Sequence, residues 1–272
     1  MGREPVHLTK EKETLLITLY GKALESRSSD SILRDEAAEE AVRRLDYDFG
    51  KLKVRRRDAV GLAIRARELD RWTAEFLADS PGAVVLHLGC GLDTRVFRVD
   101  PPASVLWFDI DYPEVIALRR RVYPDREGYR TIGSSVTDPG WLAELPAGRP
   151  AMIVAEGLLP YLAEHDARQL LERLTSHFPR GQVAFDAYSR MGARLLSFHP
   201  SIKATGASVG GWGIDDPRAL QRWVPRLELV TELISYDAAS IAKLPWAHRV
   251  IYHVARHVPA VMRMGRLLRY RF

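Results

Sequence analysis

Val84-Val85-Leu86-His87-Leu88-Gly89-Cys90-Gly91-Leu92-Asp93-Thr94 is the stretch that decides the fold. It begins with a mostly apolar run that favours extended structure. The run lacks the alternation of apolar and polar residues that is typical of a strand with one solvent-exposed face. Such a run is typical of a strand in a parallel sheet that is covered on both faces. Gly89 and Gly91 then let a ligand approach the backbone, because glycine carries no Cβ. In open α/β sheets, ligands bind at this end of the strands.

The composition is that of an ordinary globular protein. The chain has 272 residues, 46% of them hydrophobic and 28% charged, which is enough for one large domain with a sizeable core. No apolar run approaches the ~18 residues that span a bilayer, and the N-terminus lacks the apolar core of a signal peptide. One cysteine permits no internal disulfide and no metal–thiolate cluster. We therefore expect a cytoplasmic protein with no membrane partner and no metal.

Lysine and arginine outnumber aspartate and glutamate by 40 to 35. Arginine clusters at Arg55–Arg57, Arg119–Arg121 and Arg263–Arg271 could indicate a nucleic-acid surface. Each cluster, however, adjoins helix-like sequence with interleaved acids, and a net charge of +5 is small for this length. We expect solvated helix faces and no nucleic-acid partner. A preference for anionic small molecules stays open.

Helical periodicity dominates the chain ahead of the first strand. The apolar spacing predicts helices over 10–25, 29–45 and 58–78, the second capped by Ser29 or Asp30 and the third ended by Pro81-Gly82. No linker rich in glycine, serine or proline separates these helices from the rest. We therefore predict a helical cap over residues 1–80 that packs on a core of residues 81–272, as one structural unit.

Strands and helices alternate regularly after Val84. Strands are predicted over 84–88, 104–110, 129–136, 151–155, 182–186, 229–235 and 249–254, and helices over 113–123, 141–145, 164–178 and 217–224. Residues 190–213 are rich in glycine and serine and contain Trp212, so we expect a lid or substrate insertion over 190–226. The alternation predicts an α/β fold of the Rossmann-like type, with a doubly wound sheet of about seven strands.

The glycine turn could hold a dinucleotide or S-adenosylmethionine (SAM). The dinucleotide fingerprint requires a third glycine, and this chain has Thr94 at that position. Asp93 would also repel a pyrophosphate, because both are negatively charged. SAM instead carries an ammonium and a sulfonium, which a carboxylate attracts. The charge pattern therefore favours SAM, whose cations Asp93 would attract. The turn of Gly89, Cys90 and Gly91 would hold this ligand.

Two acids beyond the turn extend this candidate site. Asp111 follows the glycines by about 20 residues, at the end of the second strand, where a carboxylate can accept hydrogen bonds from ribose hydroxyls. Its alternative role is to cap the helix that begins at Pro113. Glu156 ends a buried apolar strand, where a carboxylate is costly unless it is paired. Its partner would be the ligand ammonium or, alternatively, an arginine.

These motifs together resemble one family, the leucine carboxyl methyltransferase superfamily. The chain is more similar to the bacterial branch named for a tetracenomycin polyketide O-methyltransferase, and the likeness extends over nearly the whole sequence. The residues that carry it are Gly89-x-Gly91-x-Asp93-Thr94-Arg95-x-Phe97-Arg98, Asp109-x-Asp111-x-Pro113 and Glu156-Gly157-Leu158-Leu159-x-Tyr161-Leu162.

The resemblance implies a class I SAM-dependent methyltransferase fold with a helical cap. It implies that Arg65, on the last cap helix, binds the SAM carboxylate, the alternative being an arginine on the helix surface. Ser135 and Val136 stand where relatives frame the adenine, although the usual acid of that pair is absent. The implied activity is O-methylation of a carboxylate or a phenolic hydroxyl on a small metabolite, for example an aromatic or polyketide-like compound.

The sequence does not single out a catalytic residue. A carboxylate is already ionised near neutral pH, whereas a phenol with a pKa of about 10 would benefit from a general base. Tyr188 and Arg190 follow the fifth predicted strand, His199 lies in the expected lid, and Tyr20 lies in the cap. These four are candidates for contact with the methyl acceptor. His87, inside the first strand, is expected to be a hydrogen-bonded core histidine.

Three other functions stay open. A methyltransferase for protein C-terminal carboxylates would need an open groove that admits a chain end. A non-catalytic SAM-binding module would bind SAM without turnover, and a dinucleotide oxidoreductase would bind NADH. Neither the acceptor nor the oligomeric state follows from the sequence.

Overall fold

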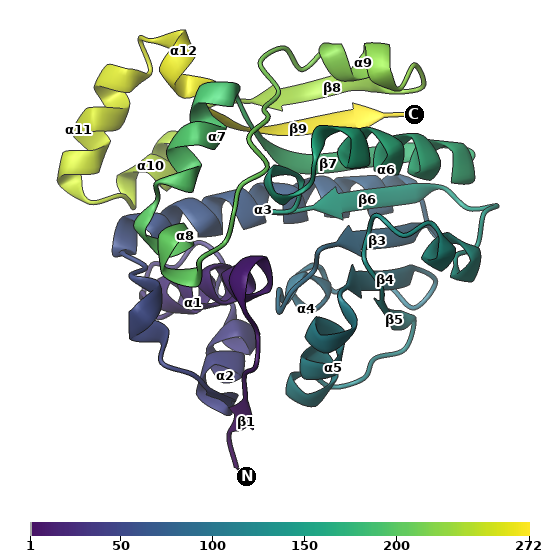
Figure 1. Ribbon diagram of the computed structural model, residues 1–272, viewed down its shortest axis with the longest axis horizontal. Coiled ribbons are helices and arrows are strands. Elements are labelled where there is room, and N and C mark those ends of the chain that lie inside the picture. Colours follow the sequence, from purple (N-terminus) through teal and green to yellow (C-terminus); the bar gives the residue numbers. More distant parts are fainter. Residues whose placement is uncertain (1) are drawn as a thin grey trace.

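A seven-stranded sheet forms the centre of the computed structural model, which describes residues 2–272. Helices lie on both faces of this sheet (Figure 1). The strands are β3 (Val84–Leu88), β4 (Leu106–Asp111), β5 (Tyr129–Gly133), β6 (Ala151–Ala155), β7 (Gly181–Tyr188), β8 (Glu228–Leu233) and β9 (Gly265–Arg271). They lie in the order β5-β4-β3-β6-β7-β9-β8, and β9 alone runs in the direction opposite to the other six strands. The predicted α/β class is confirmed.

β3 lies between β4 and β6, at the point where the strand order reverses. Val84 is in register with Leu106 of β4 on one side and with Ala151 of β6 on the other. In doubly wound sheets this reversal leaves a crevice outside the carboxyl ends of the strands. The glycine turn after β3, the acid that ends β4 and the acid that follows β6 therefore meet at one edge of the sheet.

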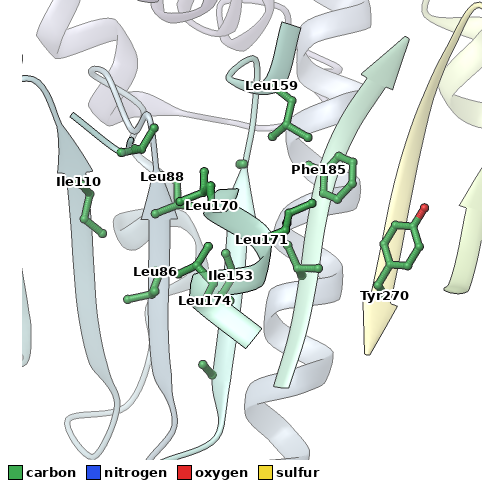
Figure 2. Close-up of a cluster of buried hydrophobic side chains, with 14 of the residues drawn as sticks. Leu86, Leu88, Ile110, Ile153, Leu159, Leu170, Leu171, Leu174, Phe185 and Tyr270 are labelled. Carbon is green, nitrogen blue, oxygen red and sulfur yellow. The ribbon is translucent and has the colours of Figure 1, made fainter. Parts of the chain in front are cut away.

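Helices bury both faces of the central strands. On one face, Leu174 of α6 (Glu164–His177) belongs to the same buried cluster as Leu86 (Figure 2). On the other face, Trp72 of α3 (Arg56–Asp79) shares a cluster with Val85. Successive β3 side chains point to opposite faces, so each of them meets a helix. This explains why β3 is apolar except for His87, which is buried with polar partners of its own.

The N-terminal helices share a hydrophobic cluster with the core. Leu16 and Leu19 of α1 (Leu15–Ser26) lie in one cluster with Val115 and Leu118 of α5 (Pro113–Val122). The other elements of this region are β1 (Glu4–Pro5), a 3₁₀ helix (Lys10–Thr14), α2 (Glu36–Arg44), β2 (Leu45–Asp46) and a second 3₁₀ helix (Phe49–Leu52). The third predicted helix, α3, is a layer of the α/β fold itself, because it covers the sheet.

The second helix starts later than the sequence predicts. α2 begins after Asp35, whose carboxylate accepts a hydrogen bond from the Ala38 N–H at 3.0 Å. Ser29 and Asp30 are therefore not its cap. The predicted start was wrong because residues 28–35 contain several serine and aspartate residues that could cap a helix, and local sequence does not rank them.

The segment between β7 and β8 is partly helical. It contains α7 (Arg190–Ser197), α8 (Pro200–Thr205) and α9 (Ala219–Trp223), and α8 packs against both N-terminal 3₁₀ helices. The remaining helices are α4 (Arg95–Val99), α10 (Ala238–Ala242), α11 (Trp246–Ala255) and α12 (Pro259–Met262), with 3₁₀ helices at Gly140–Glu144 and Leu159–Tyr161. Over residues 2–272, no helix combines the length and apolarity needed to cross a membrane.

The strand predicted over 249–254 is wrong, because this segment lies within α11. Its valine, isoleucine and tyrosine residues favour extended structure, but no neighbouring strand is available there and propensity alone does not decide. The seventh strand is instead β9, in the arginine-rich segment near Arg271. Its arginines are compatible with a strand because they pair with acids, Arg269 with Glu75 and Arg271 with Glu228.

Candidate active site

A cavity of about 390 Å³ lies at the carboxyl ends of β3, β6 and β7. A smaller pocket of about 90 Å³ adjoins it, and both are lined by Leu15, Gly89 and Tyr161. All nine residues predicted to bind the cofactor line one or both. Arg65, Gly89, Cys90, Gly91, Asp93 and Glu156 line the cavity, and Gly89, Asp111, Ser135 and Val136 line the pocket.

The glycine turn is held in a conformation that other residues rarely adopt. Gly89 and Gly91 have φ angles of 60° and 52°, in the left-handed region. A Cβ on Gly91 would lie 2.8 Å from the Cβ of Leu15, so α1 approaches the turn too closely for a side chain. The glycines are thus required by the backbone and by the helix that covers them.

Asp111 fixes the glycine turn from the neighbouring strand. Its carboxylate accepts hydrogen bonds from the N–H groups of Gly91 and Tyr112, both at 2.7 Å. These bonds do not cap the first turn of the helix at Pro113. Burial raises the pKa of Asp111 to about 6, despite the two N–H donors. The carboxylate therefore lies in the smaller pocket with a raised affinity for a proton.

Lys22 lies between the two acids of the cavity. Its Nζ is 2.7 Å from Asp93 Oδ2 and 3.0 Å from Glu156 Oε1, and its side chain is only 2% exposed. Burial alone would raise the pKa of Glu156, but Lys22, Arg65 and Arg95 together hold it below its usual range. Both carboxylates are therefore charged and already paired within the protein.

These contacts decide two of the alternatives that the sequence left open. The alternative for Glu156, an ion pair with an arginine, is observed: it bonds to Arg65 at 3.0 Å and also to Arg95. Arg65 is not a surface arginine, because its side chain is 13% exposed and it also pairs with Asp186 at 2.9 Å. A ligand ammonium would therefore join an ion network rather than neutralise an isolated acid.

Asp93 likewise has protein partners. Besides Lys22, its carboxylate pairs with Arg98 at 2.8 Å. The charge argument from sequence treated Asp93 as free to attract a cationic ligand, and in that respect it is corrected. Burial would raise the pKa of Asp93, but Arg98, Lys22 and Arg95 lower it well below its usual range.

Lys22 and Asp186 are among the cavity residues that the sequence reasoning missed. Lys22 is three residues after Leu19, on the apolar side of α1, and a lysine at such a position was a detectable signal. Asp186 lies in β7 and accepts a hydrogen bond from the Gly157 N–H at 2.6 Å. An acid within a strand as apolar as β7 was the corresponding signal there.

Of the four candidates for contact with the methyl acceptor, two line the cavity and two do not. Tyr188 and His199 line the cavity. Tyr20 instead stacks on Phe49, with ring centroids 5.1 Å apart, and is not among the cavity residues. Arg190 is exposed and lies 3.4 Å from Asp215, so its charge is directed to the surface.

Both ring nitrogens of His199 are engaged. Its Nδ1 accepts a hydrogen bond from the Ser201 N–H at 3.3 Å, which caps α8. Its Nε2 lies 3.6 Å from Asp58 Oδ1, in α3. The imidazole therefore connects α8 to α3 at the cavity wall.

His87 is a core histidine, as expected. Its Nε2 lies 2.9 Å from an Arg95 nitrogen, and its Nδ1 lies 3.3 Å from Asp109 Oδ1. Burial lowers its pKa, so the imidazole is neutral near pH 7. Across residues 2–272, no group of three or more His, Cys, Asp or Glu side chains is arranged to hold a metal ion.

The strand order, the glycine turn after β3 and the acid at the end of β4 define a Rossmann-like fold of the class I methyltransferase type. The family model for leucine carboxyl methyltransferases matches residues 15–175, and the chain belongs to this family. A protein from Thermobifida fusca described as a methyltransferase has a similar fold, with a TM-score of 0.59 at 16% identity, over 97% of this chain and 94% of that chain.

Curated relatives specify the class of enzyme. The chain is 45% identical to the tetracenomycin polyketide synthesis O-methyltransferase of Streptomyces glaucescens, over 99% of each protein. It is 32% identical to an S-adenosyl-L-methionine-dependent methyltransferase of Gibberella zeae, over 94% of this chain and 93% of that protein. The protein is therefore a SAM-dependent methyltransferase, closely related to an enzyme of polyketide synthesis.

Proposed function

We propose that this methyltransferase esterifies a carboxylate on a small aromatic or polyketide-like metabolite. The observation that carries the proposal is that the described cavity lining offers no free general base. Every imidazole and carboxylate there is engaged by other protein groups, namely Asp58, His87, Asp93, Glu156, Asp186 and His199.

The remaining ionisable groups of the cavity are not bases either. Burial raises the pKa of Tyr161 and of Tyr236 to about 12, and it also raises the pKa of Tyr188. Burial likewise raises the pKa of the Cys90 thiol. These groups stay protonated near neutral pH. An acceptor that arrives already ionised suits such a site, and carboxylic acids, with pKa values of about 4, meet that condition where simple phenols do not.

The charges of the cavity fit the methionyl end of SAM, which carries a carboxylate and an ammonium. We assign the carboxylate to Lys22 and Arg65 and the ammonium to Asp93 and Glu156, since these side chains already alternate in sign across the cavity. SAM supplies a methyl group bound to a sulfonium, which leaves as a neutral thioether.

The smaller pocket fits the adenosine part of SAM. Asp111 would accept hydrogen bonds from the ribose hydroxyls, and Ser135 and Val136 would frame the adenine. The backbone of Gly89, Cys90 and Gly91 would lie at the junction of the two parts. The protein then contributes alignment of the acceptor oxygen with the methyl group, and exclusion of water.

The relatives support the same substrate class. The family description names a carboxyl group, and the Streptomyces glaucescens relative is named an O-methyltransferase of polyketide synthesis. The alternative of a protein C-terminal carboxylate requires a groove that admits a chain end. α8 packs on the N-terminal 3₁₀ helices and lines part of the cavity, which supports a metabolite over a chain end.

The test uses the purified protein with methyl-labelled SAM and matched pairs of aromatic carboxylic acids and phenols. We expect label in products that mild alkali hydrolyses, because methyl esters are alkali-labile and aryl methyl ethers are not. Peptides with free C-terminal carboxylates form the third arm. Label only in alkali-stable products would contradict the carboxylate assignment, and label only in peptides would contradict the metabolite assignment.

A further inference from the structure

α11 presents an apolar face to solvent. Trp246, Val250 and Val254 recur every fourth residue along it and are 73%, 55% and 66% exposed. Val258, just before α12, and Val261 within it are further exposed apolar residues. We call these five residues the α11 face. Figure 1 shows α10, α11 and α12 together at one edge of the molecule.

The helix packs on the protein with its polar side instead. His248 Nε2 lies 3.0 Å from an Arg57 nitrogen, and the Tyr252 hydroxyl accepts a hydrogen bond from the Tyr236 N–H at 3.1 Å. Surface helices normally bury the apolar stripe and expose the polar one. A helix that exposes its apolar side and packs with its polar side indicates an interaction site, because contiguous exposed apolar surface is rare in monomeric proteins.

Basic residues accompany the apolar residues along this part of the chain. Residues 238–272 contain one lysine and six arginines and no aspartate or glutamate. Arg249 and Arg256 are exposed beside the α11 face. Within residues 2–272 neither has an acidic side chain at ion-pair distance, whereas the arginines of β9 are paired. The partner of this face should therefore be both apolar and negatively charged.

We propose that the α11 face docks on an anionic lipid surface. An exposed tryptophan and valines can enter the boundary between headgroups and acyl chains, while flanking arginines pair with lipid phosphates. A second copy of the chain is a poorer partner. In a two-fold contact the same patch meets itself, which would bring unpaired arginines against one another.

The docking surface lies beside the cavity that takes the acceptor. Arg57 and Asp58, adjacent at the start of α3, contact His248 of α11 and His199 at the start of α8 respectively. His199 lines the cavity. Protein bound through the α11 face would thus hold its cavity close to the lipid, where apolar acceptors partition.

The experiment is co-sedimentation of the full-length protein with vesicles of phosphatidylcholine, alone or mixed with phosphatidylglycerol. We expect binding to the mixed vesicles and little to the neutral ones, weakening as salt is added. The double variant Trp246→Ala/Val250→Ser should bind the mixed vesicles about tenfold more weakly, and Arg249→Gln/Arg256→Gln should lose about fivefold for each arginine.

Matched controls lie elsewhere on the surface. Val230→Ser in β8 and Arg130→Gln in β5 alter exposed side chains of the same types away from the α11 face and should bind as the unaltered protein does. SAM binding by every variant reports that it is folded. Equal binding to both vesicle types, no binding, or unchanged binding of the α11 variants would overturn the proposal. So would a dimer in light scattering that the same variants dissociate, or selective capture of an acidic protein without lipid binding.

Discussion

Lys22 is a buried cation that two carboxylates share. Without Lys22 both carboxylates keep arginine partners, but the buried network loses one of its cations. Removing one partner of a buried ion pair typically costs about 3–5 kcal/mol. We expect Lys22→Met to lower the free energy of unfolding by about that amount, and to weaken SAM binding about tenfold or more. Urea denaturation and calorimetric titration with SAM measure the two effects.

The matched control is another lysine in an ion pair. Lys243 pairs with Asp30 at the surface, where water screens the charges. Lys243→Met should therefore leave both the unfolding midpoint and SAM affinity unchanged. If the Lys22 variant behaved like this control, the ion network would have no part in holding the cofactor or the fold.

The carboxyl group of Asp111 gives SAM binding a pH dependence. Its pKa of about 6 in the free protein means that it gains a proton in mildly acidic solution. Ribose hydroxyls would donate to the ionised form, so SAM binding favours deprotonation. We expect affinity to fall as the pH drops through about 6, by up to about tenfold per pH unit. Titrations with SAM over this range in wild type and Asp111→Asn test it, and an equally steep dependence in the variant would refute the assignment.

At the level of single residues, sequence spacing predicted acids and glycines that line the candidate site but not the residues that pair with them. Asp111 and Glu156 could be found because each ends a strand beside the glycine turn. Lys22 and Asp186 reach the same cavity from α1 and β7, and no local pattern records that approach. The pairing of Glu156 with Arg65 spans 91 residues of sequence, which no short motif can encode.

At the level of the elements, two helices differ in how deeply they bury a leucine side chain. Leu174 of α6 is fully buried against the sheet, and Leu195 of α7 is exposed. Leu174→Ala should lower the free energy of unfolding by about 2–5 kcal/mol, because it leaves a cavity in the core. Leu195→Ala should change it by no more than about 0.5 kcal/mol. Urea denaturation of both variants checks the contrast, and equal losses would mean that α6 does not anchor this face.

The two errors in element type share one physical cause. In α11 and β9 the local composition pointed away from the final structure, since α11 contains β-branched residues and β9 contains arginines. What decides is the available partner: β9 fits between β7 and β8, and acids of β8 and α3 pair with its arginines. The expectation of no membrane partner rested on the lack of membrane-spanning runs, and such a test does not detect an exposed apolar face like that of α11.

At the level of the whole molecule, α1, α2 and α5 share one hydrophobic cluster, and this affects how cooperatively the protein unfolds. Domains with separate cores can unfold separately, whereas these helices bury their apolar sides in part against the core. We expect residues 1–80 and 81–272 to unfold in one transition. Hydrogen exchange followed by mass spectrometry should give α1 and β3 the same opening free energy, and a lower value throughout α1 and α2 would indicate an independent cap.

The overall architecture was the most predictable level. Regular alternation of strands and helices leaves few topologies, since parallel crossovers are right-handed and usually short. It predicted the doubly wound sheet and placed the site at the strand-order reversal. It could not show that α3 covers one face of the sheet. A helix that precedes the first strand does not connect two strands, so the alternation of strands and helices does not place it.

The position of β9 has a consequence for how the protein is made. β8 pairs with β9 alone in the sheet, and β9 is synthesised after both of its neighbours. While the ribosome is still adding these residues, the edge of β7 is unpaired and β8 has no strand to join. Unpaired edges promote aggregation of incomplete chains. The nascent protein should therefore depend on chaperones most strongly in the interval between β8 and β9.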